Sequence, residues 1–388
     1  MKISKKISDS IELNFSKIAK KMDKEKKIFY SLGLGEPDFN TPNFIIKSSH
    51  QAMKKGLTRY SNPAGIYDLR KEICKKLKKE NNIKSRPDEI IVTPGSKMAL
   101  SLVLMSILQP KDEVVYISPA YTSYYPQILL SESNIVVKKL CLDPNNYQIN
   151  FEKLNKIINS KTKAILINFP HNPTGQILNI NQAKSFEIIL NKYKRCFLIS
   201  DEIYEKLNFK NKKSVSPASF RSIKKRVFTI NGYSKAYSMT GWRIGYCHAR
   251  KDLIDKMIKI QQHINTNVPV FTQIAALTAY KKKSNHIKKF NLKLKKNNNY
   301  LVKKLTPNKN IEFVESYGGL FIFLDVKKTK KSSDEFCTDL LKKYAVAVTP
   351  GYFFGREWKF YIRISLAQKT VIFKKAIDYL DRYLKEIK

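Results

Sequence analysis

The stretch NGYSKAYSMTGWRIGY, from Asn231 to Tyr246, connects two apolar runs, RVFTI (226 to 230) and GWRIGYCHA (241 to 249). Short apolar runs of this kind are typical of buried strands. The single lysine between them, Lys235, follows a strand end, where burial would lower its pKa and make the amine a nucleophile toward carbonyl groups. A solvated loop lysine is the alternative, because the sequence does not show burial.

Similar apolar runs precede this stretch along most of the chain. They are EIIVT (89 to 93), EVVYI (113 to 117), NIVVKKLCL (134 to 142), AILINF (164 to 169) and CFLIS (196 to 200). Helical patterns lie between them, including 43 to 55, 66 to 80 and a buried helix over 99 to 108. Alternation of this kind predicts an α/β fold in which a mostly parallel sheet is buried on both faces.

The pattern changes after about residue 286. A lysine-rich helical stretch is followed by the apolar runs IEFVE, GLFIFLDV and FYIRIS and by a closing helix from residue 371. The chain of 388 residues is also longer than a usual single domain. We therefore predict a large α/β domain over 45–285 and a smaller α+β domain formed by 1–44 together with 286–388.

The composition argues against a membrane or secreted protein. No run reaches the roughly 18 apolar residues of a membrane span, and the N-terminus lacks the apolar region of a signal peptide. The five cysteines are scattered and form no C-x-x-C pair, which favours reduced thiols in the cytoplasm. No metal site is expected.

The formal net charge of +41 would favour binding to polyanions. Arginine, the residue that best recognises phosphates and bases, accounts for only 11 of the 73 basic residues. The lysines lie in short runs along much of the chain, and no nucleic-acid-binding motif occurs. We interpret the charge as codon bias, with weak, non-specific polyanion binding at low salt.

Polar residues that could take part in catalysis or ligand binding follow the ends of several predicted strands. They are Ser96 with Lys97, Tyr121, Asn172, Asp201 with Tyr204, and Lys235. Ligands of open α/β sheets bind outside the carboxyl ends of the strands, so we expect these residues to converge. Each also has an ordinary explanation: Asp201 as a helix cap, Tyr204 as packing, the NPTG segment as a turn, and Gly95 with Ser96 as a helix start rather than a phosphate site.

Seven motifs occur in the order and at the intervals of class I/II pyridoxal-phosphate-dependent aminotransferases. They are GEPDF (35 to 39), YSNPAG (60 to 65), SPAYTSY (118 to 124), HNPTG (171 to 175), SDEIY (200 to 204), SKAYSMTGWRIGY (234 to 246) and YIRIS (361 to 365). Over about residues 10 to 385 the chain resembles the bacterial aspartate-aminotransferase-like branch of that family. The resemblance implies fold type I, a three-layer sandwich with a mostly parallel central sheet plus a smaller α+β domain. It also implies a transaminase that uses pyridoxal 5'-phosphate.

The resemblance implies a role for each motif residue toward the cofactor ring. Lys235 would form a Schiff base with the cofactor aldehyde and then act as the base. Asp201 would pair with the pyridine nitrogen and keep it protonated. Tyr204 and Asn172 would bind the ring hydroxyl, and Tyr121 would stack on the ring.

It also implies how the two anionic groups are held. The phosphate would be bound by Arg243, Ser96 and the nearby groups of Gly95, Lys97 and Ser234, and by Tyr60 of a neighbouring subunit, which implies a homodimer with shared active sites. The substrate carboxylate would be bound by Arg363 with the backbone of Gly35, beside Tyr121 and Asn172. Gly232 departs from the pattern, because many relatives have a phosphate-binding serine there.

Substrate choice depends on Lys97, which members acting on acidic substrates also carry. This favours L-aspartate with 2-oxoglutarate, although a surface lysine or a second phosphate contact explains Lys97 equally well. Aminotransferases for aromatic amino acids, alanine or N-succinyl-diaminopimelate fit the same motifs, as does a C–S lyase on the same fold. A polyanion-binding protein on a degenerate enzyme scaffold is the alternative from another class.

Overall fold

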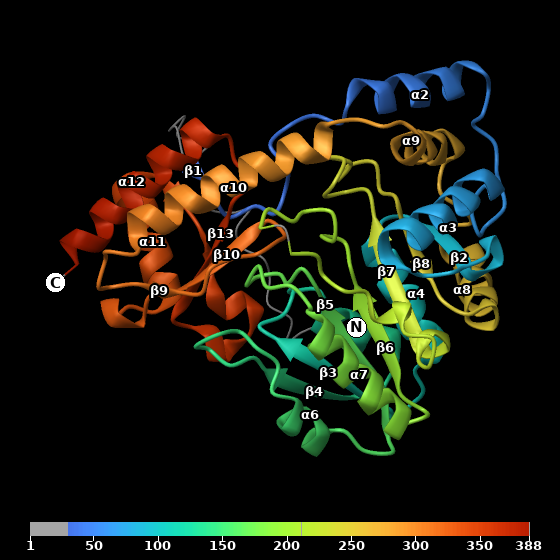
Figure 1. Cartoon of the computed structure of the whole chain (residues 1–388), viewed down its shortest axis with the longest axis horizontal. Coiled ribbons are helices and arrows are strands. Elements are labelled where there is room, and N and C mark those ends of the chain that lie inside the picture. Colours follow the sequence, from blue (N-terminus) through green and yellow to red (C-terminus); the bar gives the residue numbers. More distant parts are fainter. Residues whose placement is uncertain (1–29, 211, 388) are drawn as a thin grey trace, which may run out of the picture.

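A computed structural model describes residues 30–210 and 212–387 of the chain (Figure 1). Its larger sheet has seven strands in the order β2-β8-β7-β6-β5-β3-β4. The strands are β2 Ile90–Thr93, β3 Glu113–Ser118, β4 Val136–Cys141, β5 Thr162–Asn168, β6 Phe197–Asp201, β7 Val227–Gly232 and β8 Gly245–His248. Only β8 is antiparallel to its neighbours β2 and β7, while the other pairs are parallel. The prediction of a mostly parallel sheet is therefore confirmed.

The strands form where the apolar runs predicted them, with one correction. Every residue of the central strands β7 and β8 and of the edge strand β2 is buried, as expected for strands covered on both faces. The predicted strand over 241 to 249 was too long, because only Gly245–His248 is extended. The residues before it form a turn in which Arg243 has a φ of 52°. A left-handed residue of this kind cannot continue a strand.

Helices cover both faces of this sheet, which gives the three layers. The cluster of buried apolar residues on one face includes side chains of α3, α6, α7 and α9, and the cluster on the other face includes side chains of α4, α5 and α8. The helices of this part are α2 Asn43–Lys54, α3 Tyr67–Asn81, α4 Ser96–Ile107, α5 Tyr124–Ser131, α6 Phe151–Ile157, α7 Ile180–Lys192, α8 Lys251–Ile264 and α9 Val270–Lys281. The predicted buried helix is α4, whose apolar side chains fill the space under the sheet.

A smaller antiparallel sheet lies beside the larger one and has its own apolar core. Its order is β12-β13-β10-β9, with β9 Glu312–Phe313, β10 Phe321–Asp325, β12 Thr349–Pro350 and β13 Tyr361–Ser365. The helices α10 His286–Leu305, α11 Ser333–Tyr344 and α12 Thr370–Glu386 cover it, and β1 Tyr30–Ser31 pairs with β11 Val346–Ala347. The smaller α+β part is thus confirmed. The boundaries 45–285 against 1–44 and 286–388 stay a prediction, and residues 1–29 lie outside the described residues.

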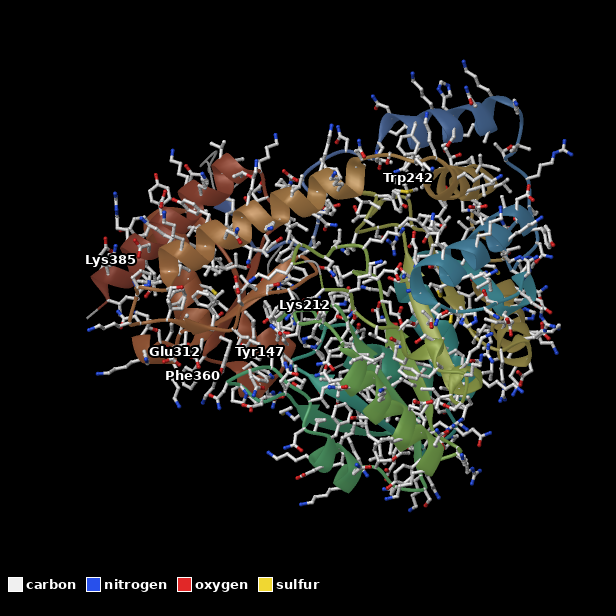
Figure 2. The ribbon with its side chains drawn as sticks, viewed as in Figure 1. Tyr147, Lys212, Trp242, Glu312, Phe360 and Lys385 are labelled. Carbon is white, nitrogen blue, oxygen red and sulfur yellow. The ribbon has the colours of Figure 1, made fainter. Side chains whose placement is uncertain are left out.

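Side chains tipped with nitrogen surround the molecule in Figure 2 and gather over no single element in that view. This arrangement agrees with the scattered lysine runs of the sequence. Within the described ranges no helix is long and apolar enough to cross a membrane. In the same part of the chain, no group of three or more His, Cys, Asp or Glu residues is placed to hold a metal ion. All five cysteines are free thiols.

Candidate active site

A pocket of about 420 Å³ lies at the carboxyl ends of the central strands. Most of the polar residues singled out in the sequence line it. They are Ser96, Lys97, Tyr121, Asn172, Asp201, Tyr204, Ser234, Lys235 and Arg243. The convergence expected from the strand ends is therefore what the structure shows, and it joins segments that are up to 147 residues apart in the sequence.

Lys235 extends into this pocket from the turn that follows β7. Its Nζ donates a hydrogen bond to the backbone oxygen of Gly35 at 2.7 Å. Burial lowers the pKa of the amine to about 8, and Arg363 and Arg243 act in the same direction, while Glu36 opposes them. The alternative of a solvated loop lysine is not supported, because the side chain lines the pocket and its Nζ is bonded to a backbone oxygen.

Asp201 is the last residue of β6 and is buried at the base of the pocket. Its carboxylate accepts hydrogen bonds from the hydroxyl of Tyr124 at 2.7 Å and from the backbone N–H of Ile203 at 3.2 Å. Burial raises the pKa of Asp201 to about 6, against the effect of these two donors and of Lys235. A cationic partner in the pocket would therefore stabilise the ionised form strongly.

Two residues of this region were missed from the sequence. Tyr124 lies in the SPAYTSY motif but carried no sign that it would reach Asp201. Asn168, the last residue of β5, donates through Nδ2 to the backbone oxygen of Asp201 at 2.8 Å and accepts through Oδ1 from the backbone N–H of Asn172 at 2.9 Å. Its position after an apolar run is the same signal that identified the other site residues. Asn168 thus ties the ends of β5 and β6 together beneath the pocket.

Arg363 lies in the middle of β13 and is buried. Its Nη1 donates to Oδ1 of Asn172 at 3.0 Å, and Nη2 donates to the backbone oxygen of Gly33 at 2.6 Å and to Oγ1 of Thr349 at 3.2 Å. Its Nε is buried without a partner among the described residues. Burial lowers the pKa of the guanidinium to about 10, so the group is still charged at neutral pH. A buried cation with an unused donor is suited to a carboxylate ligand.

The start of α4, beside Arg243, has the geometry that an anion site requires. Gly95 precedes the helix with a φ of 82° and makes no side-chain cap, so the first N–H groups of α4 are open to a ligand. A Cβ at Gly95 would come within 2.5 Å of Nη2 of Arg243, which shows how closely the arginine approaches the helix start. Nη1 of Arg243 donates to the backbone oxygen of Thr240 at 2.8 Å, and this hydrogen bond orients the guanidinium group. Ser96 and Ser234 line the same end of the pocket.

The departure at Gly232 has a structural cause. A Cβ there would lie 3.1 Å from both Cα of Gly245 and the backbone oxygen of Ile244, and 3.2 Å from Cδ1 of Ile203. The close approach of β7 and β8 leaves little room for a serine at this position. Phosphate binding would therefore rest on the remaining groups, as the sequence suggested.

Aromatic side chains and one further lysine complete the pocket. The ring of Tyr121 packs edge-on against Tyr124 with centroids 5.5 Å apart, and Nζ of Lys97 lies 5.7 Å from the Tyr121 centroid. Tyr204 is buried, and burial raises its pKa, so its hydroxyl is a neutral hydrogen-bonding group. Asn172, which accepts a hydrogen bond from Arg363, lines the same pocket.

Four predicted residues lie outside the lining of this pocket: Gly95 and Arg363, described above, and Gly35 and Tyr60. Gly35 contributes its backbone oxygen to Lys235, and a Cβ at Gly35 would come within 2.6 Å of the Phe321 ring, so the close approach needs glycine. Tyr60 is 86% exposed and does not line the pocket of its own chain. Its expected contact with a neighbouring subunit stays a prediction.

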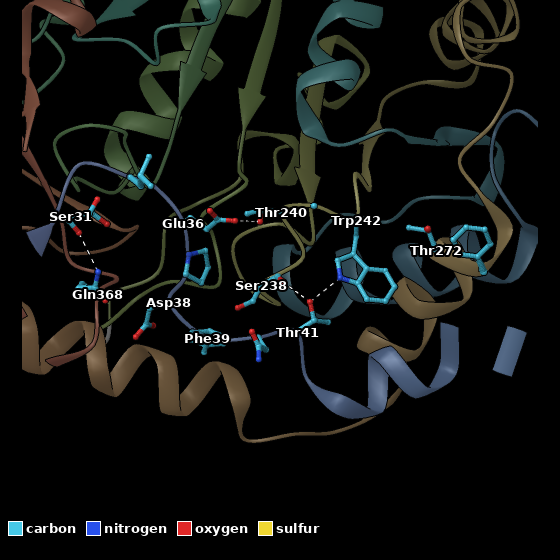
Figure 3. A pocket seen from close by; sticks show the side chains of 16 residues that line it. Ser31, Glu36, Asp38, Phe39, Thr41, Ser238, Thr240, Trp242, Thr272 and Gln368 are labelled. Atoms are coloured by element: carbon cyan, nitrogen blue, oxygen red, sulfur yellow. Dashed lines mark hydrogen bonds between the residues drawn. The ribbon is translucent and has the colours of Figure 1, made fainter. Parts of the chain in front are cut away.

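A second cavity of about 720 Å³ adjoins the first and shares Thr240 with it (Figure 3). In Figure 3 the hydroxyl of Thr41 lies between Trp242 and Ser238. It accepts a hydrogen bond from Nε1 of Trp242 at 2.9 Å and donates one to the backbone oxygen of Ser238 at 2.6 Å. This network fixes the turn that carries Thr240 and Arg243. Glu36, which accepts from the hydroxyl of Thr240, also lines this cavity.

The site combines a partly deprotonated amine, a buried carboxylate and an anion site at a helix start. These groups fit the aldehyde, the ring nitrogen and the phosphate of pyridoxal 5'-phosphate, and the glycine at position 95 leaves room beside Arg243. The fold and the site together define the class of pyridoxal-phosphate-dependent transferases.

The chain belongs to the aminotransferase class I and II family, whose family model matches residues 27–378. It is 37% identical to a probable aspartate/prephenate aminotransferase of Rickettsia conorii, with 91% of this chain and 90% of the relative covered. It is 35% identical to an aspartate aminotransferase of Pyrococcus abyssi, with 98% and 99% covered. The solved aspartate aminotransferase of Thermotoga maritima superimposes with a TM-score of 0.92 at 31% identity, covering 99% of this chain and all of that one.

Family membership confirms the predicted cofactor and the predicted activity. The protein is a pyridoxal-phosphate-dependent aminotransferase, acting on an amino acid and a 2-oxo acid. The polyanion-binding alternative is not supported. The roles assigned to individual residues stay predictions, although the positions described above are compatible with them.

Proposed function

We propose that the enzyme transfers the amino group of L-aspartate to 2-oxoglutarate. The observation that carries this proposal is the presence of two cations beside the pocket, the buried Arg363 and the exposed Lys97. Both substrates have two carboxylates, and a dicarboxylate can be held at both ends only if a cation meets each end. The relative from Pyrococcus abyssi named above, an aspartate aminotransferase, supports the same choice.

We further propose the following residue roles. Pyridoxal phosphate, when bound, supplies the electron sink for the negative charge that develops at the substrate Cα. Asp201 faces the pyridine nitrogen as a carboxylate. Tyr204 and Asn172 hold the ring hydroxyl, Tyr121 covers the ring, and the phosphate is bound by Gly95, Ser96, Ser234 and Arg243.

The proton transfer falls to Lys235 in this proposal. Its pKa of about 8 gives a free amine that can accept the Cα proton, and the hydrogen bond to Gly35 shows that Nζ reaches the segment beside the substrate site. Arg363 and the backbone of Gly35 hold the α-carboxylate, which fixes the Cα–H bond in front of the amine.

The assembly and the cellular location also belong to this proposal. We place the enzyme in the cytoplasm, which agrees with five free thiols. We propose a homodimer in which Tyr60 reaches the phosphate of the partner's site. This tyrosine is exposed and does not line the pocket of its own chain. The proposed division into 45–285 and 1–44 with 286–388 is supported by the two sheets, one in each part.

The substrate proposal is tested with the purified, cofactor-loaded enzyme and a panel of amino acids. We expect aspartate and glutamate to change the cofactor absorbance at the lowest concentrations, and Lys97→Ala to raise KM for aspartate about tenfold or more while the response to alanine is unchanged. Lys79→Ala, an exposed lysine on α3, is the matched control and should leave both responses unchanged. An equal loss for aspartate and alanine in Lys97→Ala would place Lys97 at the phosphate instead.

A second candidate acceptor comes from the Rickettsia conorii relative, whose name includes prephenate. Prephenate also has two carboxylates, so the same pair of cations fits it. Comparing prephenate with 2-oxoglutarate as the acceptor of the aspartate amino group distinguishes the two. Release of pyruvate and ammonia from a β-substituted amino acid without any 2-oxo acid would instead indicate the C–S lyase.

A further inference from the structure

Glu202 directly follows Asp201 but lies on the other side of the sheet. It is 4% exposed, and its Oε1 accepts hydrogen bonds from the hydroxyls of Ser200 at 2.9 Å and Ser216 at 2.7 Å. Its backbone N–H donates to Ile230 on the neighbouring strand β7 at 2.8 Å. The turn that carries Asp201 and Tyr204 is therefore held from below by a second buried carboxyl group. The proposed reaction makes no use of it.

The charges around Glu202 are already paired with other groups. Lys76 of α3 forms a buried ion pair with Glu205, and Asn81 donates to the same Glu205 at 2.6 Å. Lys206 pairs with Glu80 of α3 at 2.8 Å. Besides these four charged groups, the nearby titratable residues are Tyr237 after β7, and Tyr246 and Tyr280 on β8 and α9. Lys76 also lowers the pKa of Glu202, but its ion pair is with Glu205, so among the described residues Glu202 has no cation of its own.

The second oxygen of Glu202 is poorly satisfied. Its hydrogen-bonding neighbour among the described residues is Nδ2 of Asn81, at 3.5 Å. Burial and the nearby Glu205 raise the pKa of Glu202 to about 8, while the pKa of Glu205 is lowered by Lys76 and Asn81 in spite of its burial. A buried carboxyl group without a cation of its own is most stable when it is protonated. Oε1 can then donate to the hydroxyl of Ser200 or Ser216, while Oε2 accepts from Nδ2 of Asn81.

We propose that Glu202 is a positioning residue, a protonated and uncharged carboxyl that holds the turn after β6 so that Asp201 and Tyr204 keep their places in the pocket. This rests on the proposed roles of those two residues. An uncharged group has a specific advantage at this position. A second anion directly after Asp201 would oppose the ionisation of Asp201, which must be a carboxylate to face the cofactor nitrogen.

The first test uses cofactor-free protein, so it does not depend on the proposed reaction. A carboxyl whose pKa is raised from 4.5 to about 8 on folding contributes stability that is fully present below the unfolded value and lost as the pH rises through 8. Glu202→Gln keeps the uncharged shape at every pH. We expect the variant to gain thermal stability relative to the natural protein as the pH rises from about 5 to about 8. A constant difference over this range would overturn the proposal.

Glu205→Gln is the matched control, with the same chemical change three residues further along. Because it leaves the buried Lys76 unpaired, we expect a loss of stability over the whole pH range. If Glu202→Gln behaves like this control or does not fold, Glu202 is ionised in the folded protein and the proposal is wrong.

The second test measures the positioning of the site. Glu202→Ala leaves the hydroxyls of Ser200 and Ser216 without their acceptor, so we expect cofactor affinity to fall about tenfold and the pH midpoint of the bound-cofactor absorbance to shift. Glu202→Gln should retain both values. If Glu202→Ala does not fold, the same measurements are made on Ser216→Ala, a smaller change that removes only one of the two hydroxyl groups bonded to Glu202. Unchanged absorbance and affinity in the alanine variants would mean that Glu202 supports only the fold. If Glu202→Ala shifts both values while a separate experiment contradicts the role proposed for Asp201, the positioning role of Glu202 stands, and only the role of Asp201 in the reaction is wrong.

Discussion

The amine of Lys235 titrates in the range where the enzyme is expected to work. Its pKa of about 8 is set mainly by burial, which disfavours the protonated form. Only the free amine attacks an aldehyde, so below pH 8 most of the cofactor-free protein is in the unreactive ammonium form.

We therefore predict that cofactor-free protein binds pyridoxal phosphate faster as the pH rises from about 7 to about 9, with a midpoint near 8. Rapid mixing followed by absorbance measures this rate. Lys235→Ala should abolish the pH-dependent step and lower transamination at least about 10³-fold, because both the nucleophile and the base are lost. Lys251→Ala, an exposed lysine on α8, is the control. A midpoint near 10.5, the value of an unperturbed lysine, would contradict the burial of the amine.

At the scale of single residues, the sequence predicted those site residues that directly follow the end of a strand. Lys235, Asp201 and Asn172 carried that signal and line one pocket. Tyr124 did not, because its bond to Asp201 depends on the direction in which α5 leaves the strand, and no periodic pattern encodes that direction. The protonation of Glu202 is equally invisible in the sequence, since it follows from which cations are already paired.

At the scale of elements, the contact between β8 and the start of α4 limits what the chain tolerates. A Cβ at Gly245 would lie 2.5 Å from the backbone nitrogen of Ser96 and 2.7 Å from the carbonyl carbon of Gly95. Both are backbone atoms, so neither can rotate away. The apolar run over 241 to 249 predicted a longer strand because hydrophobicity alone does not report the left-handed turn at Arg243.

We predict that Gly245→Ala lowers the free energy of unfolding by about 1 to 3 kcal/mol and weakens cofactor binding, because the first turn of α4 must shift. Gly241→Ala is the matched control, since a Cβ there meets nothing within 4 Å. Urea unfolding and a cofactor titration measure the two effects. If both variants unfold at the same urea concentration as the natural protein, the packing of β8 against α4 is looser than described.

At the scale of the whole molecule, the alternation of apolar runs and helices predicted a mostly parallel sheet and a smaller α+β part, but it did not predict the strand order β2-β8-β7-β6-β5-β3-β4. Nor did it predict how the smaller sheet meets the pocket, because the hydrogen bonds of Arg363 to Asn172 and Gly33 join segments 191 and 330 residues apart. A partner subunit is likewise a property that one chain's pattern does not encode.

We predict that the protein elutes as a dimer, at about twice the chain mass of 45.0 kDa. Tyr60→Phe removes only the hydroxyl and should weaken cofactor binding about tenfold without changing the elution volume, since a hydrogen bond to a charged group is lost. Tyr67→Phe, which is 59% exposed on α3, is the control. A monomer that binds the cofactor with full affinity would contradict the shared site.

The hydrogen bond between Lys235 and Gly35 bears on the order in which the parts of the site can form during synthesis. Its two ends lie 200 residues apart, and Arg363 follows a further 128 residues along the chain. A ribosome releases the segments of the larger sheet well before β13, so the nascent chain can build its lysine-bearing turn while the clamp for the substrate is still missing. Closing such distant contacts is slow. Substrate binding, which needs Arg363, is therefore a late event, whereas the residues proposed to hold the cofactor are synthesised earlier.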